Sequence, residues 1–171
     1  MTISDLNETE YIPYFKGYID NAKGLKLLPG LQSSCNEAID FYLSIDANKL
    51  SYRYAEGKWT VKEIICHLID TERIFCYRAL RFARQDKTVL SGFDENDYVE
   101  YSKADNRSLN DLLEEYQSVR DATISLFKSF DDATLLSKGL AGTGQVSVRA
   151  LGFLIVGHEK HHIRIIKERY L

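Results

Sequence analysis

The chain contains four histidines, and three of them fall within the five residues from His158 to His162. His158 and His162 are four residues apart, so on an α-helix both imidazoles project from one face, about one turn apart. This spacing lets two ring nitrogens reach one metal ion without bending the helix. A third ligand must come from elsewhere, and the one remaining histidine is His67. We therefore predict a metal held by His67, His158 and His162.

His161 is the alternative partner of His158, because residues three and four apart share a helix face. Apolar residues define the buried direction of this helix: Leu151, Ile155, Ile163 and Ile166. At about 100° per residue, His162 lies some 40° from that direction and His161 lies far round toward the polar side. We therefore expect His162 to be the ligand. We expect His161 to lie at the surface or pocket rim with its pKa near the ordinary value of about 6.5.

Four helical segments must position these histidines. Apolar periodicity and start signals predict helices over residues 29–44, 60–84, 108–130 and 147–171. Thr60 and Glu63 form a capping box, and Ser108 and Ser147 are N-cap residues. Before the first helix, residues 1–28 are predicted to contain a short helix or turn. Residues 85–107 are predicted as a long connection, which is either functional or simply crosses the bundle, and residues 131–146 are predicted to contain a turn or short hairpin.

Two glutamates fall in the apolar faces of the helices that carry the histidines. Glu72 and Glu159 are both predicted to be buried, and a buried carboxylate needs a partner. Such a carboxylate either fixes a metal-ligating imidazole by accepting its far N–H, or forms a core salt bridge. His67, Thr71 and Arg78 align along one flank of their helix, which either lines a pocket or is an ordinary amphipathic border. For Arg78 we expect a surface salt bridge, with orientation of an anionic substrate group as the alternative.

Composition narrows the class of protein. A chain of 171 residues, 44% hydrophobic and 27% charged, suits a single globular domain spanning 1–171. The net charge of −3 without a large basic cluster argues against nucleic acid as a partner. We expect no membrane span and no signal peptide. Three cysteines without a CxxC pair predict free thiols in a reducing cytoplasm.

Four stretches together resemble the DinB/YfiT-like superfamily, whose members are described as metal-dependent enzymes. They are Lys58–Ile64 (KWTVKEI), Cys66–Glu72 (CHLIDTE), the Arg84–Phe93 connection and Gly157–His162 (GHEKHH). The likeness runs in order from about Tyr14 to Leu171. It implies an all-α fold, a four-helix bundle with an unusual order of up and down helices and a long crossover connection. It also implies a divalent metal, nickel or zinc, on three histidines, which by motif position are His67, His158 and His162.

The resemblance supports the site better than it supports a reaction. Characterised relatives include bacillithiol S-transferases and a mycothiol-dependent isomerase, and others are described as metal-dependent hydrolases. It therefore implies a small-molecule substrate, with a low-molecular-weight thiol as a second reactant in the transferases. Three histidines leave coordination positions open for water or a thiol. The competing interpretation is a non-catalytic metal- or ligand-binding bundle. We also expect a homodimer, because such bundles pair through apolar helix faces and eleven tyrosines supply aromatic surface.

Overall fold

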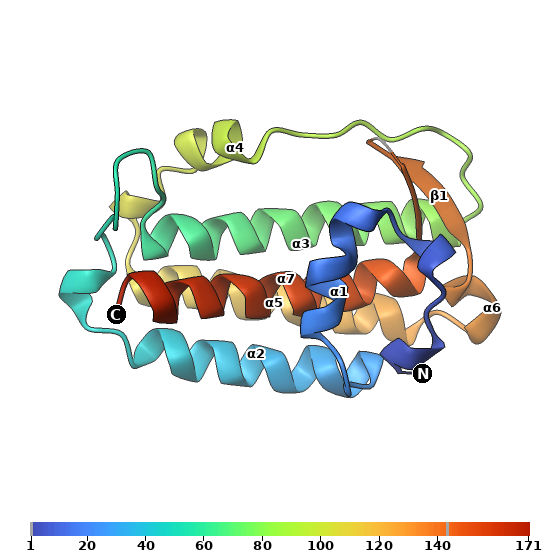
Figure 1. The fold of residues 1–171 in the computed structure, drawn as a ribbon, viewed down its shortest axis with the longest axis horizontal. Coiled ribbons are helices and arrows are strands. Elements are labelled where there is room, and N and C mark those ends of the chain that lie inside the picture. Colours follow the sequence, from blue (N-terminus) through green and yellow to red (C-terminus); the bar gives the residue numbers. More distant parts are fainter. Residues whose placement is uncertain (1, 143) are drawn as a thin grey trace.

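The computed structural model describes residues 2–142 and 144–171 and contains a bundle of four long helices (Figure 1). These helices are α2 (Leu27–Leu43), α3 (Val61–Ala83), α5 (Leu109–Lys128) and α7 (Val148–Arg169). α3 packs against α5 and α7, and α2 packs against the same two helices from the other side. The predicted four-helix bundle is therefore confirmed.

The order of directions differs from a simple up-and-down bundle. α3 and α5 run the same way, while α2 and α7 run the opposite way (Figure 1). The connection between α3 and α5 therefore returns along the length of the bundle before α5 begins, as the long crossover predicted. It carries the short helix α4 (Glu95–Ser102). Sequence periodicity did not predict α4, because only Val99 of its eight residues is buried.

The predicted start signals of three bundle helices are confirmed. The Thr60 Oγ1 accepts the N–H of Glu63 at 3.1 Å, and the Glu63 carboxylate accepts the N–H of Thr60 at 2.8 Å. Ser108 and Ser147 each accept a backbone N–H three residues further on, at 3.1 Å. Such contacts satisfy amide groups that have no partner inside the helix. They fix where α3, α5 and α7 begin, and therefore the register of every side chain that follows.

The remaining segments close the two ends and one side of the bundle. The predicted hairpin is present as β1 (Lys138–Ala141) paired antiparallel with β2 (Gly144–Ser147), after the short helix α6 (Asp132–Leu135). Near the N-terminus, α1 (Lys16–Asn21) lies across the bundle against α7 (Figure 1). α2 begins at Leu27, two residues before Pro29, which stands in its first turn. Among the described residues, no helix has the length and apolar character needed to cross a membrane.

One buried arginine contacts all four bundle helices. Arg120 on α5 donates two hydrogen bonds to the carboxylate of Glu72 on α3, at 2.8 and 2.9 Å. It also donates to Glu159 on α7 at 2.7 Å. On α2 it donates to the carbonyl oxygen of Leu31 at 2.9 Å and to the Ser34 hydroxyl at 3.0 Å. This network is the core salt bridge that sequence analysis held open for the two glutamates.

Candidate metal centre

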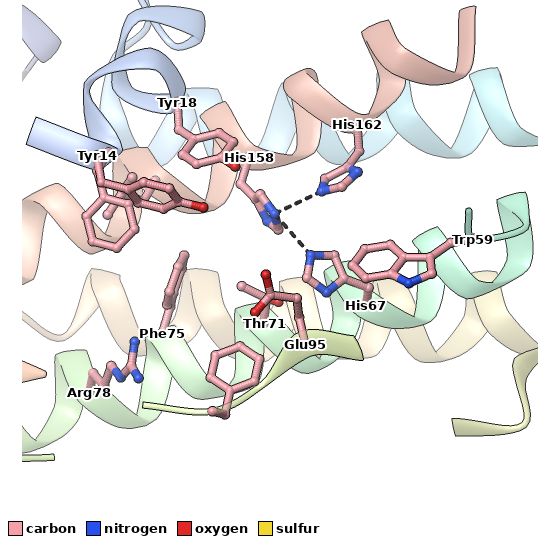
Figure 2. A pocket seen from close by; sticks show the side chains of 13 residues that line it. Tyr14, Tyr18, Trp59, His67, Thr71, Phe75, Arg78, Glu95, His158 and His162 are labelled. Carbon is pink, nitrogen blue, oxygen red and sulfur yellow. Dashed lines mark hydrogen bonds between the residues drawn. The ribbon is translucent and has the colours of Figure 1, made fainter. Parts of the chain in front are cut away.

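The three histidines predicted from the sequence meet between α3 and α7. His67 extends from α3, and His158 and His162 extend from successive turns of α7 (Figure 2). The Nε2 atom of His158 lies 3.1 Å from Nε2 of His67 and 3.0 Å from Nε2 of His162. One ring nitrogen from each residue lies within 4.8 Å of the other two. The same ring atom of all three side chains therefore points at one small volume.

This donor set fits a divalent metal. Zinc binds imidazole nitrogen at about 2.0–2.1 Å, so two nitrogens on a tetrahedral ion are about 3.3 Å apart. The two short Nε2 separations, 3.0 and 3.1 Å, are within a few tenths of an ångström of that value. Two of the three histidines lie at the i and i+4 positions of one helix, so helix geometry fixes their spacing. The third depends only on how α3 packs against α7.

Burial keeps these imidazoles in the form that binds metal. It lowers the pKa of His67 to about 4. Burial, followed by the neighbouring His67 and His161 rings, lowers the pKa of His162 to about 3. Burial also holds the pKa of His158 well below its ordinary value, with His162 and His67 adding to the effect. At neutral pH all three rings are therefore uncharged, and neutral imidazole is the metal ligand.

Aromatic rings from outside the two ligand helices hold the imidazoles in place. Trp59, just before α3, lies 4.7 Å from the His67 ring centroid and stacks on His162 at 6.3 Å and 22°. Tyr18 on α1 meets His158 edge-on at 5.3 Å. These contacts restrict the rotamers of the histidines without using their Nε2 atoms.

Gly157 lets α1 approach the histidine helix closely. A Cβ atom at this position would lie 1.9 Å from the carbonyl oxygen of Tyr18, so no larger residue fits without moving the backbone. The approach is secured by Asn21, whose side-chain amide donates to the Gly157 carbonyl at 3.2 Å. The glycine directly before His158 thus brings Tyr18 against the site.

A cavity of about 210 Å³ opens beside the three imidazoles. His67, Thr71 and Arg78 all line it, so the pocket interpretation of this α3 flank is confirmed. Its walls are mainly aromatic and aliphatic, and they come from α1 and the turn before it, from α3 and the residue Trp59 before it, from α7 and from the crossover: Tyr14, Phe15, Tyr18, Trp59, Phe75, Phe93 and Leu154. Glu95 at the start of α4 also lines it. The candidate site therefore combines three imidazole nitrogens that could hold a metal with a mostly apolar chamber.

A second cavity of about 370 Å³ lies on the other side of His162. It shares Trp59, Glu95 and His162 with the first cavity, and His161 and Lys58 line it as well. The prediction that His161 lies at a pocket rim therefore agrees with the structure. The expected ordinary pKa for His161 is wrong, because burial and then the neighbouring charge of Arg164 lower it.

Two other expectations from the sequence are corrected. Neither Glu72 nor Glu159 bonds an imidazole within the described ranges, because both carboxylates point toward Arg120 on α5. At about 100° per residue, Glu72 is about 140° round α3 from His67, so it cannot face the same side. Arg78 forms no surface salt bridge with any residue that the structure describes. It is only 8% exposed and donates to the carbonyl oxygen of Ser91 at 3.0 Å.

The cysteines are not placed for catalysis. All three are free thiols, and none of them lines the cavity beside the histidines. Cys66 precedes His67 but packs in the core, and burial raises the pKa of its thiol. Burial likewise raises the pKa of Cys35 and of Cys76 to about 12. These thiols therefore stay protonated at neutral pH.

Sequence reasoning missed Arg120 and the role of Trp59. Arg120 had a readable signal, because it stands four residues after Tyr116 and four before Ile124 on one helix face. Both of those neighbours are large hydrophobic residues on the core side of the helix, so the arginine between them had to be buried. Trp59 had no such signal, since it precedes the helix and its stacking on His162 depends on how α7 packs.

Comparison with known proteins places this fold in a family. A family model described as the DinB superfamily matches residues 37–166. A protein of Oceanobacillus iheyensis, named a putative metal-dependent hydrolase, is 22% identical over 126 residues, which are 72% of each chain.

Two solved structures share the fold. YfiT from Bacillus subtilis, described as a probable metal-dependent hydrolase with an unusual four-helix bundle topology, superposes with a TM-score of 0.71 at 17% identity, over 96% of this chain and 90% of that one. A mycothiol-dependent maleylpyruvate isomerase superposes with a TM-score of 0.64 at 12% identity, over 99% of this chain but only 63% of the isomerase. Because the family model covers most of the sequence and the bundle matches that of YfiT, the chain belongs to the DinB superfamily.

Proposed function

We propose that this protein is a divalent-metal-dependent enzyme whose ligands are His67, His158 and His162. The observation that supports this most directly is the convergence of three uncharged imidazole nitrogens, from two helices, at the wall of an apolar cavity. A structural metal site is usually closed by four protein ligands, whereas a catalytic site has three and an open position. Within the described residues only three side chains meet here. We propose nickel or zinc as the ion.

The chain's own residues define what the site does. The three histidines present uncharged nitrogens, and Trp59 and Tyr18 fix their orientation. The apolar walls exclude water and so strengthen every polar interaction inside the cavity. When bound, a divalent cation supplies a Lewis acid that favours the deprotonated form of a thiol or a water molecule at neutral pH.

Transfer of a low-molecular-weight thiol to an electrophile is the reaction we favour. Two cavities meet at His162 and Trp59, which gives two reactants separate places beside one set of ligands. In the reaction the thiol sulfur bonds to the electrophilic carbon, and the leaving group departs with the thiol proton. The maleylpyruvate isomerase that shares this fold is described as mycothiol-dependent, which supports a small thiol as co-reactant. The free cysteines are consistent with the reducing cytoplasm we propose as its location.

Hydrolysis is the second candidate. The Oceanobacillus relative is named a putative metal-dependent hydrolase and YfiT is described as a probable one, and a three-histidine site with an open position also activates water. Hydrolysis uses water as the second reactant and needs no second cavity. Thiol transfer, in contrast, requires the second cavity beside Trp59 and His162 to bind a second molecule.

Metal content tests the site. We expect about one divalent metal per chain in the purified protein, measured by elemental analysis, because three nitrogens of one site bind one ion. His67→Ala and His162→Ala should each lose most of it. His161→Ala is the matched control, since this histidine is adjacent in sequence but lies outside the three-nitrogen group, and it should keep its metal. Wild-type metal content in His67→Ala would exclude the proposed site.

Turnover tests the reaction. The metal-loaded protein is mixed with glutathione or N-acetylcysteine and with 1-chloro-2,4-dinitrobenzene, and in parallel with 4-nitrophenyl acetate alone. Thiol-dependent loss of chloride that disappears with chelator supports the transferase. Chelator-sensitive ester cleavage without thiol supports the hydrolase. Metal binding without turnover in either assay or in a wider substrate screen would support the non-catalytic alternative.

A further inference from the structure

Three arginines are buried in the described part of the chain: Arg78, Arg120 and Arg149. Arg120 is paired with two carboxylates and Arg149 with the carboxylate of Glu10. Arg78 has no ion pair among the described residues, although it is as deeply buried as Arg149. A buried charge is normally paired, because removing it from water is unfavourable. Arg120 and Arg149 thus follow this rule, and Arg78, which lines the cavity, departs from it.

The surroundings of Arg78 supply only part of its bonding capacity. A guanidinium has five N–H donors. One of the Nη2 hydrogens goes to the carbonyl oxygen of Ser91 at 3.0 Å, and the ring of Phe93 lies 5.9 Å from the guanidinium carbon. Burial lowers the pKa of Arg78, which nevertheless stays charged because an arginine pKa lies so far above neutrality. Glu95, the acid that lines the same cavity, is exposed on α4 and forms no ion pair with Arg78.

Arg78 and the histidines occupy opposite ends of one chamber. Arg78 follows His67 by about three turns of α3, so both project from the same side of that helix. In Figure 2, Arg78 lies at one end, the imidazoles at the other, and Phe75 between them. The cavity walls are mainly apolar, and their polar groups besides Arg78 and the histidines include the Thr71 hydroxyl and the Glu95 carboxylate. A ligand that spans the cavity would therefore meet a cation at one end, mostly hydrocarbon along its length and the histidine nitrogens at the other.

We propose that the cavity binds a substrate with an apolar or aromatic body and a carboxylate, that Arg78 pairs with this carboxylate, and that the other end of the substrate reaches the histidines. The assignment of the reacting end rests on the proposed function; recognition of the carboxylate does not. The substrate carboxylate would supply the negative charge that Arg78 lacks among the described residues. It would accept charge-assisted hydrogen bonds from the N–H groups of Arg78 that do not bond to the Ser91 carbonyl. Arg78 would then determine specificity for the acid over neutral analogues.

Paired probes test this assignment. We would measure the affinities of 4-phenylbutyrate and its neutral isostere 4-phenylbutyramide for the metal-loaded protein by calorimetry. A hydrogen-bonded charged group contributes enough to predict that the acid binds about 10- to 100-fold more tightly than the amide. Arg78→Met, which keeps most of the side-chain volume, should reduce this ratio to near unity. Arg78→Lys keeps the charge without the planar fork and should give an intermediate ratio.

The His67→Ala variant separates this proposal from the proposed function. If the acid binds through Arg78, the preference persists in His67→Ala even when that variant holds no metal. If the preference is lost in His67→Ala and persists in Arg78→Met, the carboxylate binds the metal and the proposal is overturned. Equal affinities for acid and amide in the wild type, or no measurable binding of the acid, would also overturn it.

The thermal stability of Arg78→Met supplies an independent test, because replacing an arginine that serves only the fold would lower the unfolding temperature. Arg78→Met removes an unpaired buried charge and leaves no carboxylate without a partner. Its unfolding temperature without ligand should therefore equal or exceed that of the wild type. A variant that fails to fold, or unfolds well below the wild type, would show that Arg78 serves the fold, and the proposal would fall.

Discussion

Replacing Arg120 by methionine tests the buried charge network most directly. The substitution keeps an unbranched side chain between the helices but removes every donor of the guanidinium. Glu72 and Glu159 would then remain as two buried carboxylates without their cation. Breaking a buried ion pair by removing one partner costs about 3–5 kcal/mol. We therefore expect Arg120→Met to be strongly destabilised, although the residue touches no ligand of the proposed metal.

The size of the effect follows from the length of the chain. Unfolding entropy is about 2.1 cal/mol/K per residue, or about 0.36 kcal/mol/K for a chain of this size. A loss of about 3–5 kcal/mol should therefore lower the unfolding temperature by about 8–14 °C. Because Arg120 binds helices α3 and α7, which carry the histidines, metal affinity should fall as well.

Two controls make the measurement specific. Arg73→Met removes an arginine whose side chain is 50% exposed and whose partners are Asp70 and Glu115. Exposed pairs contribute about 0–1 kcal/mol, so this variant should shift by no more than about 3 °C. The triple variant Glu72→Gln, Arg120→Met, Glu159→Gln removes all three charges together and should recover part of the lost stability.

Thermal unfolding followed by circular dichroism, with elemental analysis of the folded protein, would give both readouts. If Arg120→Met unfolded within about 3 °C of the wild type, the stability of the protein would not depend on the pairing of Glu72 and Glu159 with Arg120. If the triple variant were less stable than Arg120→Met, unpaired charge would not be the cause of the loss.

Three further predictions follow from the site and the surface. Without metal, the free energy of unfolding should fall as pH drops from about 6.5 toward about 4, because the histidines of the unfolded chain bind protons in this range and the buried imidazoles do not. His67 alone, whose pKa burial lowers to about 4, accounts for a loss of about 3 kcal/mol of this free energy. Urea midpoints across this range should show the slope, and His67→Gln should make it shallower without removing it, because the pKa values of His158 and His162 are lowered as well. Gly157→Ala should destabilise by about 1–3 kcal/mol, since its Cβ meets the Tyr18 carbonyl; an unchanged midpoint would show that α1 moves freely. The homodimer stays a prediction, and a monomeric mass in light scattering at micromolar concentration would contradict it.

Much of the site was readable in the sequence because helices are periodic. The spacing of His158 and His162 placed these two histidines on one face, and the apolar wheel of their helix placed His161 away from that face. The capping residues Thr60 and Ser147 fixed where α3 and α7 begin, as the structure confirms. The wheel also predicted correctly that Glu72 and Glu159 are buried. These are properties of single helices, which short-range geometry determines.

Only tertiary packing decided what lies opposite each helix face. Periodicity showed that Glu72 points inward, but the packing of α5 made Arg120 its partner in place of a histidine. Periodicity also placed Arg78 on a flank of its helix. Only the crossover, which returns along α3, buries Arg78 and leaves it facing a cavity. Helix geometry relates residues within about a turn of one another, whereas a contact between segments depends on how whole helices pack. For that reason the sequence predicted which histidines would form the site, and the fold decided that the three meet and that a cavity lies beside them.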